Sequence, residues 1–224
     1  TLDPDIQRAA WDALGNRRGA VVAMDPATGR ILAMVSKPTF DANLLAGLSF
    51  GEVSDAYRSY IDSADAPLIN RAIGGDLYHP GSVFKLVVAA AALESGNYTA
   101  QSEFENLESF RLPGTLTEIR NASRTSCGVG DTVTLEQALI RSCNIPFALL
   151  AIELGQDKIR AQAELMGFGD LVEIPLGVTP SIYPAGMNDA QTALSGFGQF
   201  DVRTSPMQMA MVTAAIANQG VIMT

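Results

Sequence analysis

Two short apolar runs near the start of the chain give the clearest pattern of hydrophobic and polar positions. Residues 20–24 (Ala-Val-Val-Ala-Met) and 31–35 (Ile-Leu-Ala-Met-Val) flank residues 25–30, which are rich in turn-forming types. This arrangement predicts a β-hairpin. Because both runs are apolar at almost every position rather than at alternate ones, we expect helices to cover both faces of this antiparallel sheet.

Helical patterns account for much of the remaining chain. The predicted helices cover residues 5–14, 82–95, a segment that begins at 134, and then 144–154, 157–166 and 205–218. Their starts and ends carry capping residues and glycines of the expected kinds. Residues 36–81 and 100–131 contain scattered glycine and proline, and we predict them to be irregular loops of the kind on which substrate sites are often built.

The composition narrows the classes of function. Of the 224 residues, 47% are hydrophobic and 17% are charged, which is typical of a globular protein with a sizeable core. The formal net charge of −9 argues against nucleic-acid binding, because that function needs a basic face. No apolar stretch of the sequence approaches the ~18 residues that a membrane span requires.

Ser82 and Lys85 are the first candidate functional pair. They follow Pro80-Gly81, which cannot continue a preceding helix, and they precede the apolar run 86–93. Residues three apart lie on one face of a helix, so the hydroxyl and the amine can meet. A helix that is apolar on every side is buried, and burial disfavours a charged ammonium, so Lys85 is suited to act as a base toward Ser82. The competing interpretation is a chance spacing.

Ser142 and Asn144 are the second candidate pair, and they fall between two helical segments just before Pro146. The hydroxyl can relay a proton and the amide can bind a substrate amide or carbonyl, if the backbone bends so that both face one cleft. Taken alone, Ser-x-Asn is more often a helix cap or a turn. Cys143 lies between the two, and we expect a disulfide with Cys127; two free buried thiols are the alternative.

Together the two motifs resemble those of the penicillin-binding protein transpeptidases, which carry Ser-x-x-Lys, then Ser-x-Asn, then Lys-Thr-Gly. The resemblance extends over nearly the whole chain. It includes the segments at residues 1–7, 19–36, 40–43, 70–72, 196–199, 205–210 and 217–220. The context of Cys127 and of Ser142-Cys143-Asn144 is most similar to class B enzymes of actinobacteria.

The resemblance implies a fold class. We expect the α/β (α+β) fold that these transpeptidases share with serine β-lactamases, an antiparallel sheet between helices plus an all-helical subdomain. Within a partial domain of residues 1–224, residues 1–81 would hold the N-terminal helix, hairpin and loops, 82–170 the mostly helical part with both motifs, and 171–224 a loop and a returning helix. No lysine of the chain is followed by Thr-Gly or Ser-Gly, so we expect the third motif and the closing strands beyond residue 224.

The resemblance also implies a reaction. Ser82 would attack the penultimate D-Ala carbonyl of a peptidoglycan stem peptide, with Lys85 as base, Ser142 as proton relay and Asn144 as substrate-binding residue. An amine of a second stem peptide would complete the cross-link, and β-lactams would acylate the same serine. No metal and no organic cofactor is implied. The expected partners are stem peptides ending in D-Ala-D-Ala, β-lactams and divisome proteins, with no nucleic acid. The expected place is the extracytoplasmic face of the bacterial membrane, with an N-terminal anchor outside this sequence.

Three other functions stay open. A β-lactamase would need a glutamate-activated water, and Glu153, Glu164 and Glu173 follow Asn144, although none is followed by asparagine four residues later. A D,D-carboxypeptidase would use the same residues with water as the acceptor. A penicillin-binding sensor or an inactive scaffold would be acylated without turnover.

Overall fold

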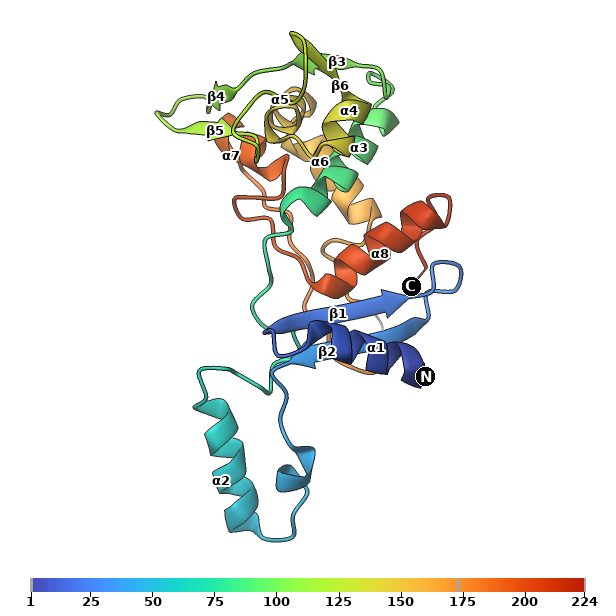
Figure 1. The fold of residues 1–224 in the computed structure, drawn as a ribbon, viewed down its shortest axis with the longest axis vertical. Coiled ribbons are helices and arrows are strands. Elements are labelled where there is room, and N and C mark those ends of the chain that lie inside the picture. Colours follow the sequence, from blue (N-terminus) through green and yellow to red (C-terminus); the bar gives the residue numbers. More distant parts are fainter. Residues whose placement is uncertain (1, 173, 224) are drawn as a thin grey trace. The chain divides into compact units, whose positions relative to one another are not determined.

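The computed structural model describes residues 2–172 and 174–223 and contains two compact units (Figure 1). We call the unit Thr1–Leu77, Val172–Thr179 and Ser205–Thr224 the hairpin unit, and the unit Tyr78–Leu171 and Pro180–Thr204 the helical unit. Glu173, one of the glutamates considered for a β-lactamase, lies outside the described residues.

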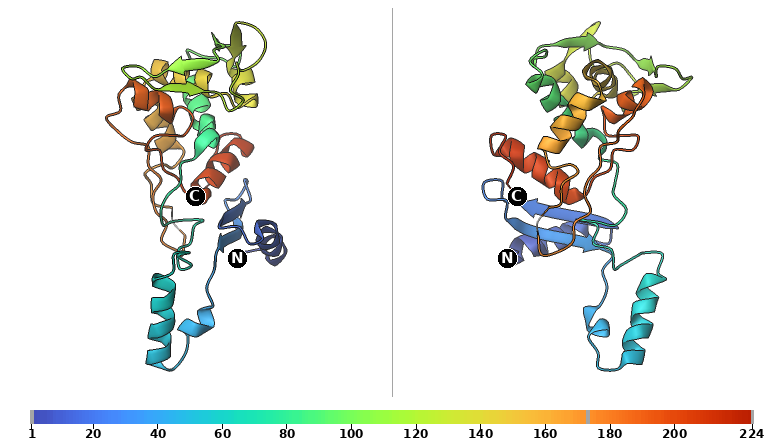
Figure 2. Two further views of the ribbon diagram at one scale, coloured as in Figure 1. Left: turned by 60° about the vertical axis from the view of Figure 1, so that its left-hand side comes forward. Right: turned by 180° about the vertical axis from the view of Figure 1, so that it is seen from behind.

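The hairpin unit is built around the antiparallel strands β1 (Gly19–Met24) and β2 (Ile31–Lys37). The helix α1 (Pro4–Leu14) packs on both strands and α8 (Pro206–Ala217) packs on β1 (Figures 1 and 2). The turn between the strands is held by the Asp25 carboxylate, which accepts hydrogen bonds from the Ala27 amide and the Thr28 hydroxyl. The predicted hairpin, with a helix on each face, is confirmed.

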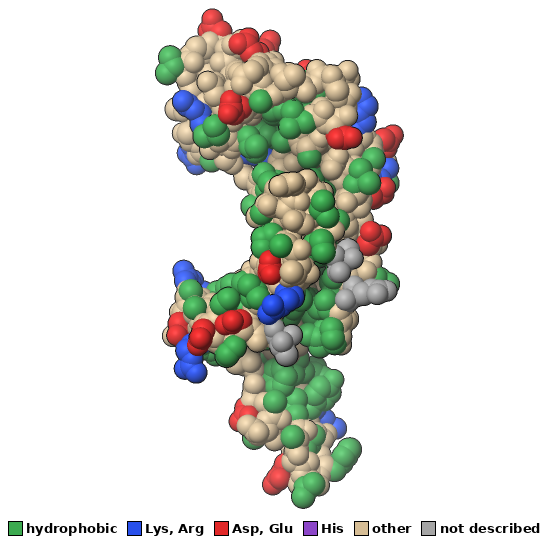
Figure 3. Space-filling view, turned by 90° about the vertical axis from the view of Figure 1, so that its right-hand side faces the viewer, with side chains coloured by type: hydrophobic (Ala, Val, Ile, Leu, Met, Phe, Trp, Pro, Cys, Tyr) green, Lys and Arg blue, Asp and Glu red, His purple; other side chains and the backbone are tan. Residues whose placement is uncertain are grey.

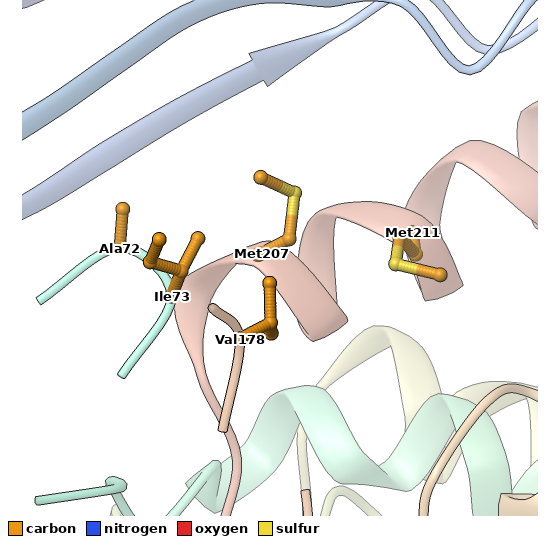
Figure 4. Close-up of a cluster of buried hydrophobic side chains, with 5 residues drawn as sticks. All are labelled: Ala72, Ile73, Val178, Met207 and Met211. Carbon is orange, nitrogen blue, oxygen red and sulfur yellow. The ribbon is translucent and has the colours of Figure 1, made fainter. Parts of the chain in front are cut away.

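The two faces of the hairpin pack into separate apolar clusters. On one face, Ala33 and Val35 of β2 are buried against Ala10 of α1. On the other, partly buried residues of both strands pack against the cluster drawn in Figure 4, which consists of Ala72, Ile73, Val178, Met207 and Met211. Alternate positions of a strand point to opposite faces, so covering both faces requires apolar residues at consecutive positions.

The segment between β2 and the helical unit was predicted to be irregular, and that prediction is wrong. It contains a short 3-10 helix, η1 (Ala42–Leu45), and a three-turn helix, α2 (Phe50–Ile61). None of the α2 residues is buried, and the helix extends away from the β1–β2 hairpin in both views of Figure 2. Hydrophobic side chains are visible at the bottom of Figure 3. The large apolar side chains exposed on the segment of η1 and α2 are Leu44, Leu48, Phe50, Tyr57 and Ile61.

The helical unit consists mainly of packed helices (Figure 1). These are the 3-10 helix η2 (Gly81–Phe84) and the α-helices α3 (Lys85–Glu94), α4 (Leu135–Ile140), α5 (Asn144–Leu154), α6 (Gln156–Leu165) and α7 (Asp189–Ser195). Two pairs of antiparallel strands complete it: β3 (Glu103–Glu105) with β6 (Thr132–Thr134), and β4 (Ser109–Arg111) with β5 (Glu118–Arg120). Three of these strands lie in the region 100–131, which was predicted to be loop.

The central helix of this unit is α5, which contacts α3, α4, α6 and α7. It is apolar on every side, and Ile145, Phe147 and Leu150 are fully buried. Its observed bounds equal the predicted 144–154. In the described part of the chain, no helix combines the length and the hydrophobicity needed to cross a bilayer.

Candidate active site

Ser82 lies in a tight turn that two glycines make possible. The turn is the 3-10 helix η2, and the α-helix begins only at Lys85, so the predicted α-helical start at Ser82 is wrong by one turn. Gly81 has φ +59°, and its amide donates to the Gly198 carbonyl at 3.0 Å. A Cβ atom on Gly198 would overlap the Gly81 carbonyl. The sequence therefore presents an exposed serine directly before a buried helix.

Lys85 is fully buried, with 0% of its surface exposed. Its Nζ atom lies 3.1 Å from Ser82 Oγ, 2.7 Å from the Ser142 carbonyl oxygen, 3.2 Å from Ser142 Oγ and 2.9 Å from Asn144 Oδ1. The structure thus brings together all four residues that the two motifs singled out.

These four neighbours suit a neutral amine. The Ser142 carbonyl and the Asn144 amide oxygen can only accept hydrogen bonds, and they lie closest to Nζ. A neutral amine has two N–H donors, which these two oxygens take up, and one lone pair. That lone pair is left for a hydroxyl group, and Ser82 Oγ lies within hydrogen-bond distance of it. The arrangement can therefore receive the serine proton.

Burial acts on the same amine electrostatically. Desolvation lowers the pKa of Lys85 from 10.5 to about 8, because the charged form is disfavoured away from water. No carboxylate forms an ion pair with Lys85 in the described residues; the ion pair found there joins Arg160 and Asp157. At neutral pH a usable fraction of the amine is therefore uncharged.

Ser142 and Asn144 occupy the bend between α4 and α5. Ser142 has φ +55°, a left-handed conformation that is uncommon for serine and that clusters at functional sites. Backbone hydrogen bonds fix the bend, from Ser142 N to Leu139 O (3.0 Å) and from Cys143 N to Ala138 O (2.9 Å). The bend is what allows a hydroxyl and an amide two positions apart to face the same amine.

Cys127 and Cys143 are joined by a disulfide, with their Cα atoms 5.7 Å apart. Both are buried, and Arg141 adds a hydrogen bond to the Cys127 carbonyl at 3.3 Å. This links the loop after β5 to the residue between Ser142 and Asn144.

A cavity of about 570 Å³ opens at Ser82. Its polar lining comes from Ser82, Arg120, Asn144 and Gln199, and its apolar lining from Ile119, Leu194, Phe197 and Phe200. Arg120 is the charged residue of this lining, and no hydrogen bond or ion pair of its guanidinium is present among the described residues. Glu153 and Glu164 are exposed and do not line the cavity; Glu153 accepts a hydrogen bond from the Tyr98 hydroxyl.

Residues 19–224 match the family model described as the penicillin binding protein transpeptidase domain. The chain belongs to the penicillin-binding protein transpeptidase family. This confirms the family and the fold class that the resemblance implied. Residues 82–85 and 142–144 have the residue types and the spacing of Ser-x-x-Lys and Ser-x-Asn.

Two relatives show how much of the chain is similar to known transpeptidases. The peptidoglycan D,D-transpeptidase PbpA of Mycolicibacterium smegmatis is 40% identical over 229 residues, which cover 100% of this chain and 46% of that protein. MrdA of Acinetobacter baumannii, also a peptidoglycan D,D-transpeptidase, is 34% identical over 98% of this chain and 33% of its own length. The chain thus spans at most about half the length of these relatives, and the expected similarity to actinobacterial class B enzymes is confirmed.

Solved structures of family members are also similar to this chain over almost its whole length. The penicillin G acyl-enzyme complex of penicillin-binding protein A from M. tuberculosis has a TM-score of 0.92 and 36% identity, covering 99% of this chain and 52% of that chain. The ceftriaxone and imipenem acyl-enzyme complexes of that protein give TM-scores of 0.92 and 0.93.

Two residues that sequence reasoning did not single out also belong to the site. The Arg120 carbonyl accepts a hydrogen bond from Asn144 Nδ2 at 3.0 Å, and the Asn121 side chain accepts hydrogen bonds from the amides of Asn144 and Ile145. They lie more than 20 positions before Asn144, and no local spacing in the sequence indicates them.

Proposed function

We propose that this chain carries the nucleophile and the base of a peptidoglycan D,D-transpeptidase that β-lactams inactivate covalently. The observation that carries the proposal is the position of the Lys85 amine: buried, lowered in pKa, and within 3.2 Å of Ser82, Ser142 and Asn144. The solved acyl-enzyme complexes of penicillin-binding protein A support it, since they show that this fold forms esters with β-lactams.

The geometry supports the following acylation step. The Ser82 proton moves to Lys85 Nζ while Oγ attacks the carbonyl carbon of the penultimate D-Ala. The C–N bond breaks, the proton on Lys85 Nζ passes through the Ser142 hydroxyl to the leaving amine, and D-Ala departs with Lys85 neutral again. The Ser82 amide supplies one donor of the oxyanion hole, and the free N–H of the Asn144 amide binds the donor peptide.

Deacylation restores the enzyme. An amine of a second stem peptide attacks the ester carbonyl, its surplus proton is taken by Lys85 and returned to Ser82 Oγ, and the new amide is the cross-link. A β-lactam enters by the same first step, because its amide bond is opened by the same attack. No cofactor takes part in this scheme.

A labelled penicillin tests the nucleophile. The longest natural polypeptide that contains this sequence should gain one covalent adduct, located at Ser82 by mass spectrometry of its peptides. Ser82→Ala should abolish the label. Ser95→Ala, at the opposite end of α3, is the matched control and should label normally, since its hydroxyl donates to the Ala92 carbonyl and accepts from the Asn97 amide, both away from the cavity lining. Labelling that persists in folded Ser82→Ala protein would refute the proposal.

Peptide substrates separate the transpeptidase from its alternatives. A D-Ala-D-Ala peptide offered with an acceptor amine should give cross-linked product. Release of D-Ala without cross-linking would indicate a carboxypeptidase, rapid β-lactam hydrolysis a β-lactamase, and acylation with no turnover of any peptide a sensor. Of the glutamates that follow Asn144, Glu153 and Glu164 do not line the cavity, which counts against these two as the residue that would activate water.

We also propose where in the cell the protein works and in which process. Peptidoglycan lies outside the cytoplasmic membrane, so we place the site on the extracytoplasmic face, in a protein held by an N-terminal anchor and working with divisome proteins in wall synthesis at division. Depletion in the source bacterium tests this. Filaments or chains of undivided cells are expected, and rounded cells that still divide would point to elongation instead.

A further inference from the structure

The N-terminus of α5 is capped by a residue from elsewhere in the chain. Cys143 occupies the N-cap position, where serine, threonine, aspartate or asparagine usually accepts a hydrogen bond from the first turn. The Cys143 side chain makes no such bond, because its sulfur is committed to the disulfide. Asn121 replaces it: its Oδ1 accepts from Asn144 N at 2.8 Å and from Ile145 N at 3.1 Å.

The cap itself is held rigidly. Asn121 is 4% exposed, and its Nδ2 donates to the Thr125 carbonyl at 3.0 Å. Both ends of its amide are therefore bonded, which fixes the position of the accepting oxygen. The loop that carries it is tied to the same junction a second time through Cys127.

These contacts define where the Asn144 side chain points. Asn121 holds the Asn144 main-chain nitrogen, and the neighbouring Arg120 carbonyl accepts from Asn144 Nδ2 at 3.0 Å. With those two atoms held, Asn144 Oδ1 faces Lys85 Nζ at 2.9 Å. Because an amide that is hydrogen-bonded at one end cannot rotate freely, the direction of this oxygen is set from outside α5.

We propose that Asn121 is a positioning residue of the active site, which acts on acylation through Asn144. The inference deepens the proposed function and rests on it. In the described structure, Asn121 makes no hydrogen bond to Ser82 and does not line the cavity. Its task is to hold Asn144 so that the amide oxygen occupies one N–H of Lys85 and leaves the amine's lone pair for Ser82.

A double-mutant cycle on the longest natural polypeptide tests this, with a fluorescent penicillin as the probe. Asn121→Ala should lower the acylation rate constant by about tenfold or more, as misplaced catalytic groups do. In an Asn144→Ala background the same change should lower it by less than about threefold, because the group through which Asn121 acts is gone. Equal effects in both backgrounds, or an unchanged rate for Asn121→Ala, would overturn the inference.

The matched control is Asn188→Ala. Asn188 caps α7 by a capping box, so its loss should lower the melting temperature but leave acylation within about twofold of wild type. A purely structural role for Asn121 would make it behave like Asn188. If the wild-type protein is not acylated at all, it is the proposed function that fails.

Asn121→Asp keeps the proposal testable if the alanine variant does not fold. The carboxylate still accepts from both amides, although it cannot donate to the Thr125 carbonyl. It adds a negative charge to the residue that holds Asn144, and this charge favours the charged amine of Lys85. The midpoint of the acylation pH profile should therefore move to higher pH, with most of the rate recovered above it. An unmoved midpoint would count against a link from Asn121 to Lys85.

Discussion

The helices α3 and α5 differ from α2 in what surrounds them, although the three have similar lengths. The first two are apolar on every side and bury most of their residues, whereas α2 has exposed apolar side chains and buries none. A buried helix can have its first residues held from several elements at once, and Lys85 and Asn144 both stand at such first positions. The candidate site thus lies where desolvation and fixed geometry coincide, which an exposed helix cannot offer.

Removing the amine of Lys85 should have the largest effect. Lys85→Met preserves a long apolar side chain in the buried position, and we expect acylation by penicillin to slow by about a thousandfold because general-base catalysis is lost. Acylation kinetics with a fluorescent penicillin measure this. Lys37→Met is the control, since Lys37 donates to the carbonyls of Trp11 and Gly15 in the hairpin unit and its loss should not change the rate. A Lys85→Met rate close to wild type would refute the role of base.

The contrast between the buried helix α5 and the exposed helix α2 should also appear in the free energy of unfolding. Phe147 in α5 is fully buried, and Phe147→Ala should lower the free energy of unfolding by about 3–5 kcal/mol. Phe50 at the start of α2 is 88% exposed, and Phe50→Ala should change it by less than about 0.5 kcal/mol. Urea unfolding followed by circular dichroism measures both. A large loss for Phe50→Ala would show that α2 packs on a surface, and the comparison between the helices would fail.

The contrast also explains which parts of the fold sequence reasoning predicted. The hairpin and α5 follow from long apolar runs with clear boundaries, such as Pro146 in the first turn of α5 and Gly155 after its end. The helix α2 lacks such a run because it has no core to face, and its N-cap Ser49 makes no side-chain hydrogen bond. Strands of three residues, such as β4 and β5, are too short for their alternation to be recognised.

The site was predictable to the extent that it is local. Ser82 and Lys85 are three positions apart, and Ser142 and Asn144 are two apart, so each pair carries its own spacing signal. That the pairs meet at one amine depends on the packing of α3 against α5, which the resemblance to a known family implied. Asn121 and Arg120 could not be found in this way, because their partner Asn144 lies 23 and 24 positions away.

The next largest effect on stability should come from loss of the disulfide, which holds the start of α5. It closes a sequence separation of 16 residues, and its removal in Cys127→Ser/Cys143→Ser should lower the free energy of unfolding by about 3 kcal/mol. Comparing urea unfolding of this variant with that of oxidised wild type measures the effect. Two titratable thiols in folded wild-type protein that has not been reduced would show that the bond is absent in solution.

The burial of Lys85 predicts a pH dependence. The base is the neutral amine, and its pKa of about 8 means that the rate should rise as pH increases through 8. About one amine in a hundred is neutral two units below the pKa and half are neutral at it, so acylation should be about 50-fold faster at pH 8 than at pH 6. Stopped-flow measurements with Ser82→Ala as the blank for spontaneous β-lactam hydrolysis give the profile. A flat profile between pH 6 and 9 would contradict a titrating base.

The smallest predicted effect concerns a residue at an exposed position of the cavity. Arg120 lines the cavity together with Ser82, and its guanidinium has no carboxylate partner among the described residues, so it should attract the carboxylate of an incoming penicillin. Because exposed ion pairs contribute little, Arg120→Gln should slow acylation by only about threefold, and less at high salt. Arg124→Gln removes the same charge from a nearby exposed position that does not line the cavity. An equal decrease in the acylation rate of both variants would show that the attraction comes from the overall charge of the protein. A decrease in Arg120→Gln alone would show that this arginine attracts the penicillin at the cavity.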